Sequence, residues 1–375
     1  MTSIRRLIPL SPAAALMLTI VPPAHGSSDS QGCHPARNSS GWQLYEQQFV
    51  SDEGRVIDTG NDGVSHSEGQ GFGLRLAFHF GERQDFARIW SWTREHLYVR
   101  GDHLAAWRWR PDADPHIDDT NNATDGDLFI AWSLALAGRC WNDPEYLDWA
   151  HRITKDIREK LVKETKVGYL LLPGAAGFVK DQLLTLNPSY WVFPALDELA
   201  ALEPDAPEWP GLVTAGYALA EQLSFGRWKL VPDWVDWSSE TGYALPEQFA
   251  PRFGYDAVRV PLYVIWHGRD PDILTRLARY WDEQARWPWQ PDWVDLETDA
   301  VSSYDAPAGI AAVSELTRFA VASVKEPNTA AFLSLPAVDA SPNGALDYYS
   351  ASLSLLSRIA ATTWCRQYGC DVTGR

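Results

Sequence analysis

Helical periodicity is the feature that most constrains the fold of this chain. Apolar side chains recur every three or four residues, as in Phe86, Ile89, Trp90 and Leu97 and again in Tyr146, Trp149, Ile153, Ile157 and Leu161. Further helical runs are expected near 68–80, 122–139, 189–202, 209–225, 255–267, 271–286, 305–323 and 346–362. Gly- and Pro-rich turns separate these runs, and strand-like alternation is scarce apart from short stretches such as 168–172. The pattern predicts an all-α chain.

The spacing of similar motifs predicts how the helices are grouped. Glu68 and Asp125, each at an expected helix start, lie 57 positions apart. The tetrapeptide Pro-Asp-Trp-Val at 232–235 recurs 59 positions later at 291–294. Such a spacing accommodates one helical hairpin per repeat, so roughly six hairpins fill the chain. Since no stretch has the composition of a linker, we predict a single closed helical toroid over residues 27–375.

The first 26 residues have the pattern of a secretory signal peptide. Arg5 and Arg6 precede a short apolar stretch, 7–21, and Ala24-His25-Gly26 is a plausible cleavage site. The apolar stretch contains two prolines and is too short to span a bilayer as a stable helix. We therefore expect a periplasmic or secreted protein that does not insert into the membrane.

Charge and aromatic content narrow the class of partner. The formal net charge is −17, from 32 Lys and Arg against 49 Asp and Glu, which argues against binding nucleic acid or anionic membranes. Neutral polysaccharides remain compatible with this charge. The chain also has 19 tryptophans, and although most single tryptophans belong to a core, their flat faces stack well on sugar rings.

The four cysteines leave several pairings open. In an oxidising compartment, Cys365 can form a disulfide with Cys370. Alternatively, Cys33 can pair with either of these two cysteines, and the sequence does not distinguish between the pairings. Cys140 follows an expected helix, and we predict a buried free thiol there. No C-x-x-C motif or Cys/His cluster indicates a zinc site.

Two acids stand before the helical run that starts near residue 128. Asp125 and Asp127 are separated by Gly126, which would allow another backbone to approach closely. Two residues apart, the acids cannot share a helix face, so one can bind a substrate hydroxyl while the other caps or pairs. Taken alone, each acid is equally well explained as a helix cap.

Two further acids suit general acid–base chemistry. Hydrolysis of a glycosidic bond needs an acid on one face of the sugar and a base or nucleophile on the other. Glu68 is followed by apolar residues, so partial burial could keep it protonated near neutral pH. Asp256 has Arg259 three residues later, which would keep it ionised, although the pair could also be an ordinary helix salt bridge. Carboxylates at three helix starts predict one cleft that handles sugars or protons.

The order of the motifs along the chain and their amino-acid sequences resemble those of glycoside hydrolase family 8. The similarity runs from about Trp42 to Asp305, and the segments 104–109 and 232–235 are most similar to the endo-β-1,4-glucanases that accompany bacterial cellulose synthase. The region after about 326 does not resemble those relatives. The motifs are Ser-His-Ser-Glu-Gly-Gln-Gly-Phe-Gly at 65–73, Ala-Thr-Asp-Gly-Asp-Leu at 123–128, Asn-Pro-Ser-Tyr at 187–190 and Tyr-Asp-Ala-Val-Arg at 255–259.

The resemblance implies a fold and a set of roles. It implies an (α/α)6 barrel of six helical hairpins and an inverting mechanism without metal or organic cofactor. Glu68 matches the general acid, Asp256 the base that activates water, and Asp125 the carboxylate that grips the sugar at the cleavage point. The other residues expected to bind substrate are Gln70, Tyr190, Arg259 and, as an aromatic platform, Trp107.

The expected function is therefore a secreted endo-β-1,4-glucanase acting on internal bonds of cellulose, with a link to the cellulose synthase complex. Xylan, chitosan and mixed-linkage β-glucan are the alternative substrates within the family, and chitosan, being cationic, suits an acidic groove. A different class, a catalytically weak glucan-binding accessory protein, would not need Glu68 and Asp256 together.

Overall fold

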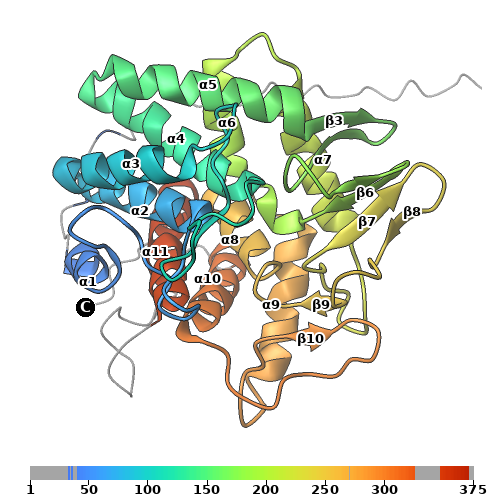
Figure 1. Cartoon of the computed structure of the whole chain (residues 1–375). Coiled ribbons are helices and arrows are strands. Elements are labelled where there is room, and N and C mark those ends of the chain that lie inside the picture. The colour runs from blue at the N-terminus through green and yellow to red at the C-terminus, as the bar shows by residue number, and fades with distance from the viewer. Residues whose placement is uncertain (1–32, 34, 37–39, 270, 326–346, 371–375) are drawn as a thin grey trace, which may run out of the picture. The chain divides into compact units, whose positions relative to one another are not determined.

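A computed structural model describes residues 33, 35–36, 40–269, 271–325 and 347–370. The predicted signal peptide, residues 1–26, lies outside the described residues. Helices dominate the described part of the chain, as predicted (Figure 1). The eleven α-helices of these residues are α1 Ser40–Phe49, α2 Ser67–Phe80, α3 Arg83–Leu97, α4 Thr124–Trp141, α5 Pro144–Leu161, α6 Phe193–Leu202, α7 Glu208–Gln222, α8 Arg259–Trp266, α9 Asp272–Gln284, α10 Ala308–Lys325 and α11 Tyr348–Tyr368.

Helix packing closes into a ring. Helix α2 packs on α4, α4 on α6, α6 on α8, α8 on α11, and α11 packs back on α2. Helices α3, α5 and α7 each follow a ring helix in the chain and pack against it. The 57-residue spacing between Glu68 and Asp125 is thus the step from the α2–α3 hairpin to the α4–α5 hairpin. The helix before α2, over 40–49, was not predicted, although Trp42, Tyr45 and Phe49 are buried at helical spacing.

The hairpin turns have sequence signals that stop one helix and start the next. Gly81 ends α2 with a φ of 78°, a left-handed conformation that glycine adopts without strain. Asn142 ends α4 in the same conformation, and the Asp143 side chain then accepts hydrogen bonds from the first backbone N–H groups of α5. Pro144 fills the first turn of α5, where its missing N–H costs nothing.

Short strands gather beside the helices rather than forming a separate layer (Figure 1). The largest sheet is antiparallel in the order β5-β6-β7-β8 and joins residues 179–186 to residues 235–244. Among the strands of the described residues, only the one near 168–172 was predicted. The strands are β1 Ser65–His66, β2 Arg108–Trp109, β3 Val162–Thr165, β4 Gly168–Leu171, β5 Val179–Lys180, β6 Leu183–Leu186, β7 Val235–Ser238, β8 Gly242–Ala244, β9 Arg252–Phe253 and β10 Val294–Asp295.

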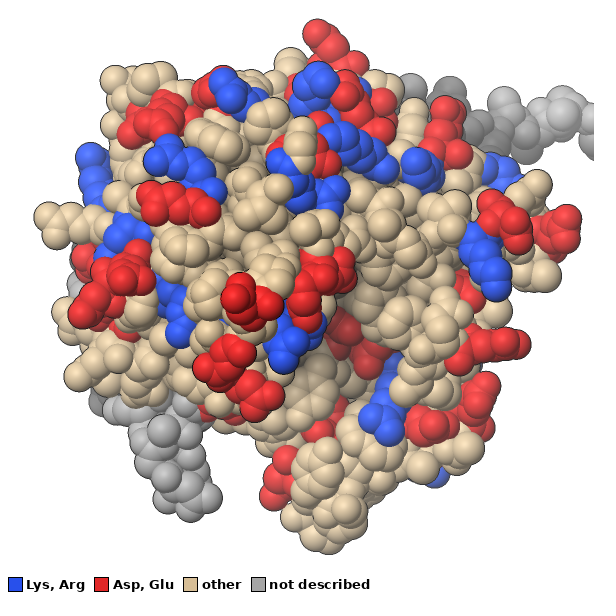
Figure 2. Space-filling view, viewed as in Figure 1, with Lys and Arg blue, Asp and Glu red and all other residues tan. Residues whose placement is uncertain are grey.

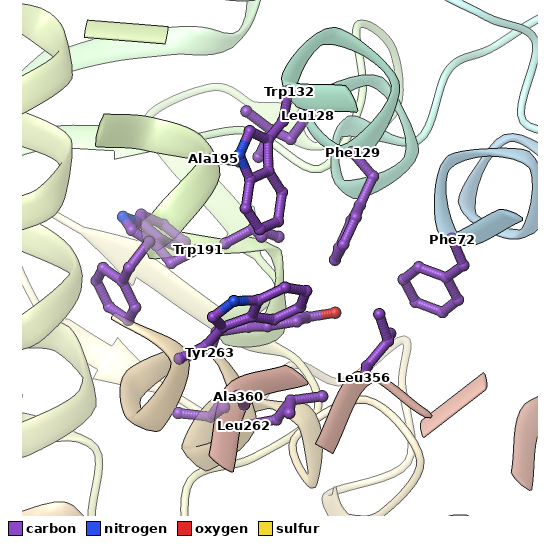
Figure 3. Packing of buried hydrophobic residues seen from close by; sticks show 14 of the residues in the cluster. Phe72, Leu128, Phe129, Trp132, Trp191, Ala195, Leu262, Tyr263, Leu356 and Ala360 are labelled. Carbon is purple, nitrogen blue, oxygen red and sulfur yellow. The ribbon is translucent and has the colours of Figure 1, made fainter. Parts of the chain in front are cut away.

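The hydrophobic core fills the space between the ring helices (Figure 3). Phe72 from α2, Phe129 from α4 and Tyr263 from α8 are fully buried. The ring centroids of Phe72 and Phe129 are 4.8 Å apart, and those of Phe129 and Tyr263 are 5.8 Å apart. Each of these aromatics lies four residues, about one helical turn, after a predicted site residue on the same helix. The core therefore forms a packed floor beneath the site.

Two disulfides settle the cysteine question. Cys365 pairs with Cys370, which is one of the pairings that the sequence analysis left open. The prediction of a free thiol at Cys140 was wrong, because Cys140 pairs with Cys33. Cys140 is the next-to-last residue of α4, where it meets a segment 107 positions away in the sequence.

None of the described helices is both long and apolar enough to cross a membrane.

Candidate active site

Two glycines let α2 and α4 cross closely and bring Glu68 beside Asp125. A Cβ atom on Gly126 would lie 2.3 Å from the Ser67 Oγ atom, and one on Gly71 would lie 2.6 Å from the Phe129 Cβ atom. Both distances are far below van der Waals contact, so only glycine fits at this crossing. This confirms the expectation that Gly126 permits close approach of a second backbone, and the approaching segment is the first turn of α2.

His66 fixes the start of the helix that carries Glu68. Its Nδ1 atom accepts a hydrogen bond from the Gly69 backbone N–H at 3.0 Å, which caps α2. Nδ1 therefore carries no proton, and Nε2–H donates to the Asp58 carboxylate at 3.2 Å. The Asp58–His66 pair thus holds the first turn of α2 in one position.

The loop before α8 presents Asp256, and a buried acid shapes this loop. The Oδ1 atom of Asp233 accepts hydrogen bonds from the backbone N–H groups of Gly254 at 2.9 Å and Ala257 at 2.7 Å. These two bonds close the loop around Asp256 and leave its side chain directed at the first residue of α8, Arg259. Burial, together with the charge of Asp256, raises the pKa of Asp233 to about 7.

Arg259 joins all three predicted carboxylates. Its Nη2 atom donates to Asp256 Oδ1 at 2.6 Å, and its Nη1 atom donates to Asp125 Oδ2 at 3.2 Å and to Glu68. Nη2 also donates to the Ser189 hydroxyl at 3.1 Å. Arg259 is only 2% exposed, so these contacts are shielded from water and strong. The structure therefore unites in one cluster the four residues that the sequence placed on three helix starts.

The electrostatics of the cluster follow from three acids sharing one guanidinium. Burial and the charge of Glu68 raise the pKa of Asp125 well above its usual value. Burial also raises the pKa of Asp256, although Arg259 opposes the shift. Burial acts in the same way on Glu68, but Arg259, His66 and a hydrogen bond with Asp125 outweigh it and lower its pKa. Of the three acids, Asp125 and Asp256 therefore have a raised pKa and Glu68 has a lowered one.

The directions of these pKa shifts run against the sequence expectation of a protonated Glu68 and an ionised Asp256. The reason is that Arg259 does not serve Asp256 alone. Its Nη1 atom faces Glu68 and Asp125 and stabilises the charged form of both.

The cluster opens into a cleft of about 460 Å³. Glu68, Asp256 and Arg259 line the cleft, while Asp125 lies beneath them and is 2% exposed. The other residues that line it are Asp58, Gly60, Asn61, Tyr255, Pro307, Asp347 and Tyr349. The space-filling view shows a hollow in the surface with acidic side chains at its floor and rim (Figure 2). A groove of this kind suits a neutral or cationic polar chain.

The two predicted aromatic residues lie next to the cluster. The Trp107 backbone carbonyl accepts a hydrogen bond from the Ser67 N–H, which places Trp107 beside the start of α2. Its ring is half-buried, Nε1–H donates to Asp119 at 2.9 Å, and the Arg108 guanidinium covers one face at 4.4 Å from the centroid. Tyr190 is half-buried, and burial together with the charges of Asp125 and Asp256 raises its pKa strongly.

Gln70 does not fit the predicted role in binding substrate. Its side chain is 0% exposed and does not line the cleft. The amide oxygen accepts from the Val56 N–H at 2.6 Å, and the amide nitrogen donates to the Thr93 hydroxyl at 2.6 Å. Gln70 therefore ties α2 to α3 and to the loop at 54–56.

The sequence left open which of Asp125 and Asp127 would pair with other groups of the protein, and in the structure Asp127 does so. Its carboxylate accepts from the Ala105 N–H at 2.8 Å and from the Asn122 amide at 2.8 Å, so it fixes the segment that leads into Trp107. Burial raises the pKa of Asp127 to about 7. Asp125, by contrast, turns toward Arg259.

Sequence reasoning missed the residues that support the cluster, chiefly Asn187, Ser189 and Asp233. Asn187 and Ser189 belong to a motif that had been quoted only for Tyr190, and Asp233 belongs to the repeated tetrapeptide. A helix-cap signal, Asn187 before Pro188, was present in the sequence but could not indicate which cluster it would meet.

No group of acids, histidines and cysteines in the described residues is arranged to hold a metal ion.

The chain is similar to known proteins over most of its length. A probable endoglucanase of Novacetimonas hansenii is 39% identical over 321 residues, covering 85% of this chain and 89% of the relative. An endoglucanase of Cellulomonas uda is 35% identical over 74% of this chain and 76% of its own. The solved structure of an endo-β-1,4-glucanase from Acetobacter xylinum superposes with a TM-score of 0.78 at 38% identity, over 87% of this chain and 98% of that one. The model of the glycosyl hydrolases family 8 matches residues 18–363, and the chain belongs to this family.

Proposed function

We propose that the protein is an endo-β-1,4-glucanase that hydrolyses internal β-1,4-glucosidic bonds of cellulose with inversion at the anomeric carbon. The observation that carries this proposal is the cluster of Glu68, Asp125 and Asp256 around Arg259 at the wall of an acidic cleft. A protein that only binds glucan has no need for acids arranged in this way. The relatives that cover most of this chain are named as endoglucanases.

Each acid has a chemical task in this mechanism. Glu68 donates its proton to the glycosidic oxygen while the bond from that oxygen to the anomeric carbon breaks. A water molecule attacks the same carbon from the opposite face, and Asp256 accepts the proton that the water loses. Asp125 accepts a hydrogen bond from a hydroxyl of the sugar at the cleavage point.

Substrate binding favours the protonated form of Glu68 that the mechanism requires. Burial is already the largest influence on Glu68 and favours its neutral form. A sugar chain in the cleft excludes further water, which strengthens this influence and raises the pKa of Glu68. Asp256 keeps its contact with Arg259, which favours the ionised form that a base requires.

We also propose the finer architecture and the cellular setting. Ring helices that alternate with outer helices support an (α/α)6 barrel. Two disulfides and the signal-like residues 1–26 support export to the periplasm or beyond. The similarity of 104–109 and 232–235 to the glucanases of cellulose-producing bacteria supports a link to cellulose synthesis.

Hydrolysis of defined polymers tests the proposal. Reducing-sugar release is measured on carboxymethylcellulose, xylan, chitosan and mixed-linkage glucan for the mature protein and for Glu68→Gln and Asp256→Asn. We expect cleavage of the cellulose derivative, the α-anomer as the first product by NMR, and a loss of at least about a hundredfold in both variants. Preferential cleavage of another polymer would reassign the substrate. Retained glucan binding without any cleavage would favour an accessory protein.

A further inference from the structure

The loop that carries the proposed base, residues 254–258 between β9 and α8, is exposed to the cleft. Tyr255 is 44% exposed and lines the cleft together with Asp256. Exposed loops are usually more mobile than the elements they connect. A base that must be aligned with a water molecule works well only when its carboxylate is held in place. The loop therefore needs anchors outside the cleft.

The first copy of the Pro-Asp-Trp-Val tetrapeptide anchors the backbone of this loop through one residue. The Asp233 backbone N–H donates to the Arg252 carbonyl at 2.6 Å. The Asp233 Oδ1 atom accepts from the backbone N–H groups of Gly254 at 2.9 Å and Ala257 at 2.7 Å. These two N–H groups stand on either side of Asp256 in the chain. A single carboxylate oxygen thus fixes the backbone both before and after the base.

The second copy of the tetrapeptide reaches the same loop from a different part of the chain. Its last residue, Val294, pairs with Phe253 in the two-stranded sheet of β9 and β10. Asp292, two residues earlier, is 3% exposed, and its Oδ2 atom accepts from the Tyr255 hydroxyl at 2.8 Å. Asp292 therefore holds the side chain of the residue directly before the base.

The contacts of the two copies complement each other. The acid of the first copy fixes the backbone around Asp256, and the acid of the second copy fixes the neighbouring side chain. Neither Asp233 nor Asp292 lines the cleft, so both are free of any direct contact with a sugar chain bound there. The second residue of each tetrapeptide thus contacts the same loop, and the repeat has one place of action in the structure.

We propose that the two tetrapeptides form a clamp on the loop of the base, in which Asp233 and Asp292 are positioning residues for Asp256. The inference rests on the proposed function, in which Asp256 accepts a proton from the attacking water. The hydrogen bond from Arg259 holds the Asp256 carboxylate but not the backbone from which that side chain extends. The clamp supplies the fixed backbone, and a displacement of about 1 Å at a reacting group can cost about 100-fold in rate.

Two substitutions of Asp233 test the backbone half of the clamp. Asp233→Ala removes the acceptor, and we expect kcat on cello-oligosaccharides to fall by about 10- to 100-fold with KM nearly unchanged. Asp233→Asn keeps an acceptor oxygen and should retain most of kcat. Because this variant also removes a charge near Asp256, kcat is compared at the maximum of each variant's pH profile. Equal losses in the two variants would overturn the proposal, since the clamp depends on the acceptor and not on the charge.

Asp292→Ala and Asp292→Asn test the side-chain half in the same way, because an asparagine can still accept from the Tyr255 hydroxyl. Asp143→Ala is the matched control. Asp143 also accepts two backbone hydrogen bonds, but it does so at the start of α5, at the opposite end of α4 from Asp125. This control should unfold at a lower denaturant concentration and keep a normal kcat. Normal kcat values in the folded Asp233→Ala and Asp292→Ala variants would overturn the proposal.

A measurement without substrate separates this proposal from the proposed function. Hydrogen exchange of the mature protein, followed by mass spectrometry, reports on the backbone N–H groups of the loop at 254–258. In Asp233→Ala we expect faster exchange in peptides that cover this loop and unchanged exchange in the α4–α5 hairpin, even if no glucan proves to be a substrate. Unchanged exchange in the loop would contradict the clamp, even if the wild type is an active glucanase. If Asp233→Ala does not fold, as judged by circular dichroism, Asp292→Ala is used for both tests.

Discussion

At the scale of single residues, Trp107 is the best candidate for a sugar platform. It lies beside the first turn of α2, one ring face is covered by Arg108, and the ring is half-buried. Trp107→Ala should weaken binding of cello-oligosaccharides by about 1–2 kcal/mol, because the ring face stacks on glucose. Isothermal titration calorimetry measures this loss. Trp107→Phe keeps an aromatic face but loses the bond to Asp119, so most of the affinity should remain.

An unchanged affinity in Trp107→Ala would give the ring a structural role instead.

The same distinction between a site role and a structural role applies to the other predicted site residues. Glu68, Asp125 and Asp256 could be predicted because each stands at a helix start within a recognisable motif. Gln70 stood in the same motif and misled, because a sequence pattern does not reveal which face of a helix is turned to the cleft. Burial and partners, which decide between the two roles, depend on distant segments such as the loop at 54–56.

At the scale of elements, the two disulfides should differ in their contribution to stability. Cys33–Cys140 closes a loop of 107 positions, whereas Cys365–Cys370 closes one of 5. In the chain-entropy model these loops correspond to about 5 and about 2 kcal/mol, and measured values are often smaller. Denaturant unfolding of Cys33→Ser/Cys140→Ser and of Cys365→Ser/Cys370→Ser should therefore show the larger loss for the first pair. The opposite order would mean that native contacts outweigh loop entropy.

The repeated tetrapeptide shows where element-level prediction failed. Neither copy lies on a helix; both flank the loop that carries Asp256. Asp233 accepts from the backbone of this loop, and Asp292 accepts from the Tyr255 hydroxyl at 2.8 Å. The copies therefore share a local task rather than a place in a helical repeat. The strands were missed for a related reason: β5 to β8 have two to four residues each, which is too few to display alternation, and β6 pairs with β7 across about 50 positions of sequence.

At the scale of the whole molecule, the ring of helices was predictable because long amphipathic helices carry their signal locally. Its closure, by contrast, rests on contacts such as that of α11 with α2, between the two ends of the described chain. Closure brings the N-terminal ends of α2, α4 and α8 together, and with them three acids and Arg259. Periodicity could not reveal that one guanidinium would join all three acids.

The buried acids make global stability depend on pH in a defined window. The pKa of Asp127 is about 7 in the folded protein, against 3.8 for an exposed aspartate. A raised folded pKa means that the folded state binds the proton more tightly. The resulting stability is fully present below pH 4 and is lost as the pH rises through 7. Acids with a lowered pKa, such as Asp102 at about 2, change stability only below pH 4 and do not interfere.

The free energy of unfolding in urea should therefore fall between pH 5 and pH 8, with Asp127 contributing on the order of 2 kcal/mol of the loss. Self-repulsion of a chain with net charge −17 acts in the same direction, so a control must separate the two. Asp127→Asn provides it. The variant loses the bond from Asn122 and should be less stable than the wild type at pH 5, yet its own decline toward pH 8 should be smaller. Equal declines in both proteins would show that Asp127 is already ionised at pH 5, and that the slope comes from the net charge and from the other buried acids with a raised pKa, such as Asp233.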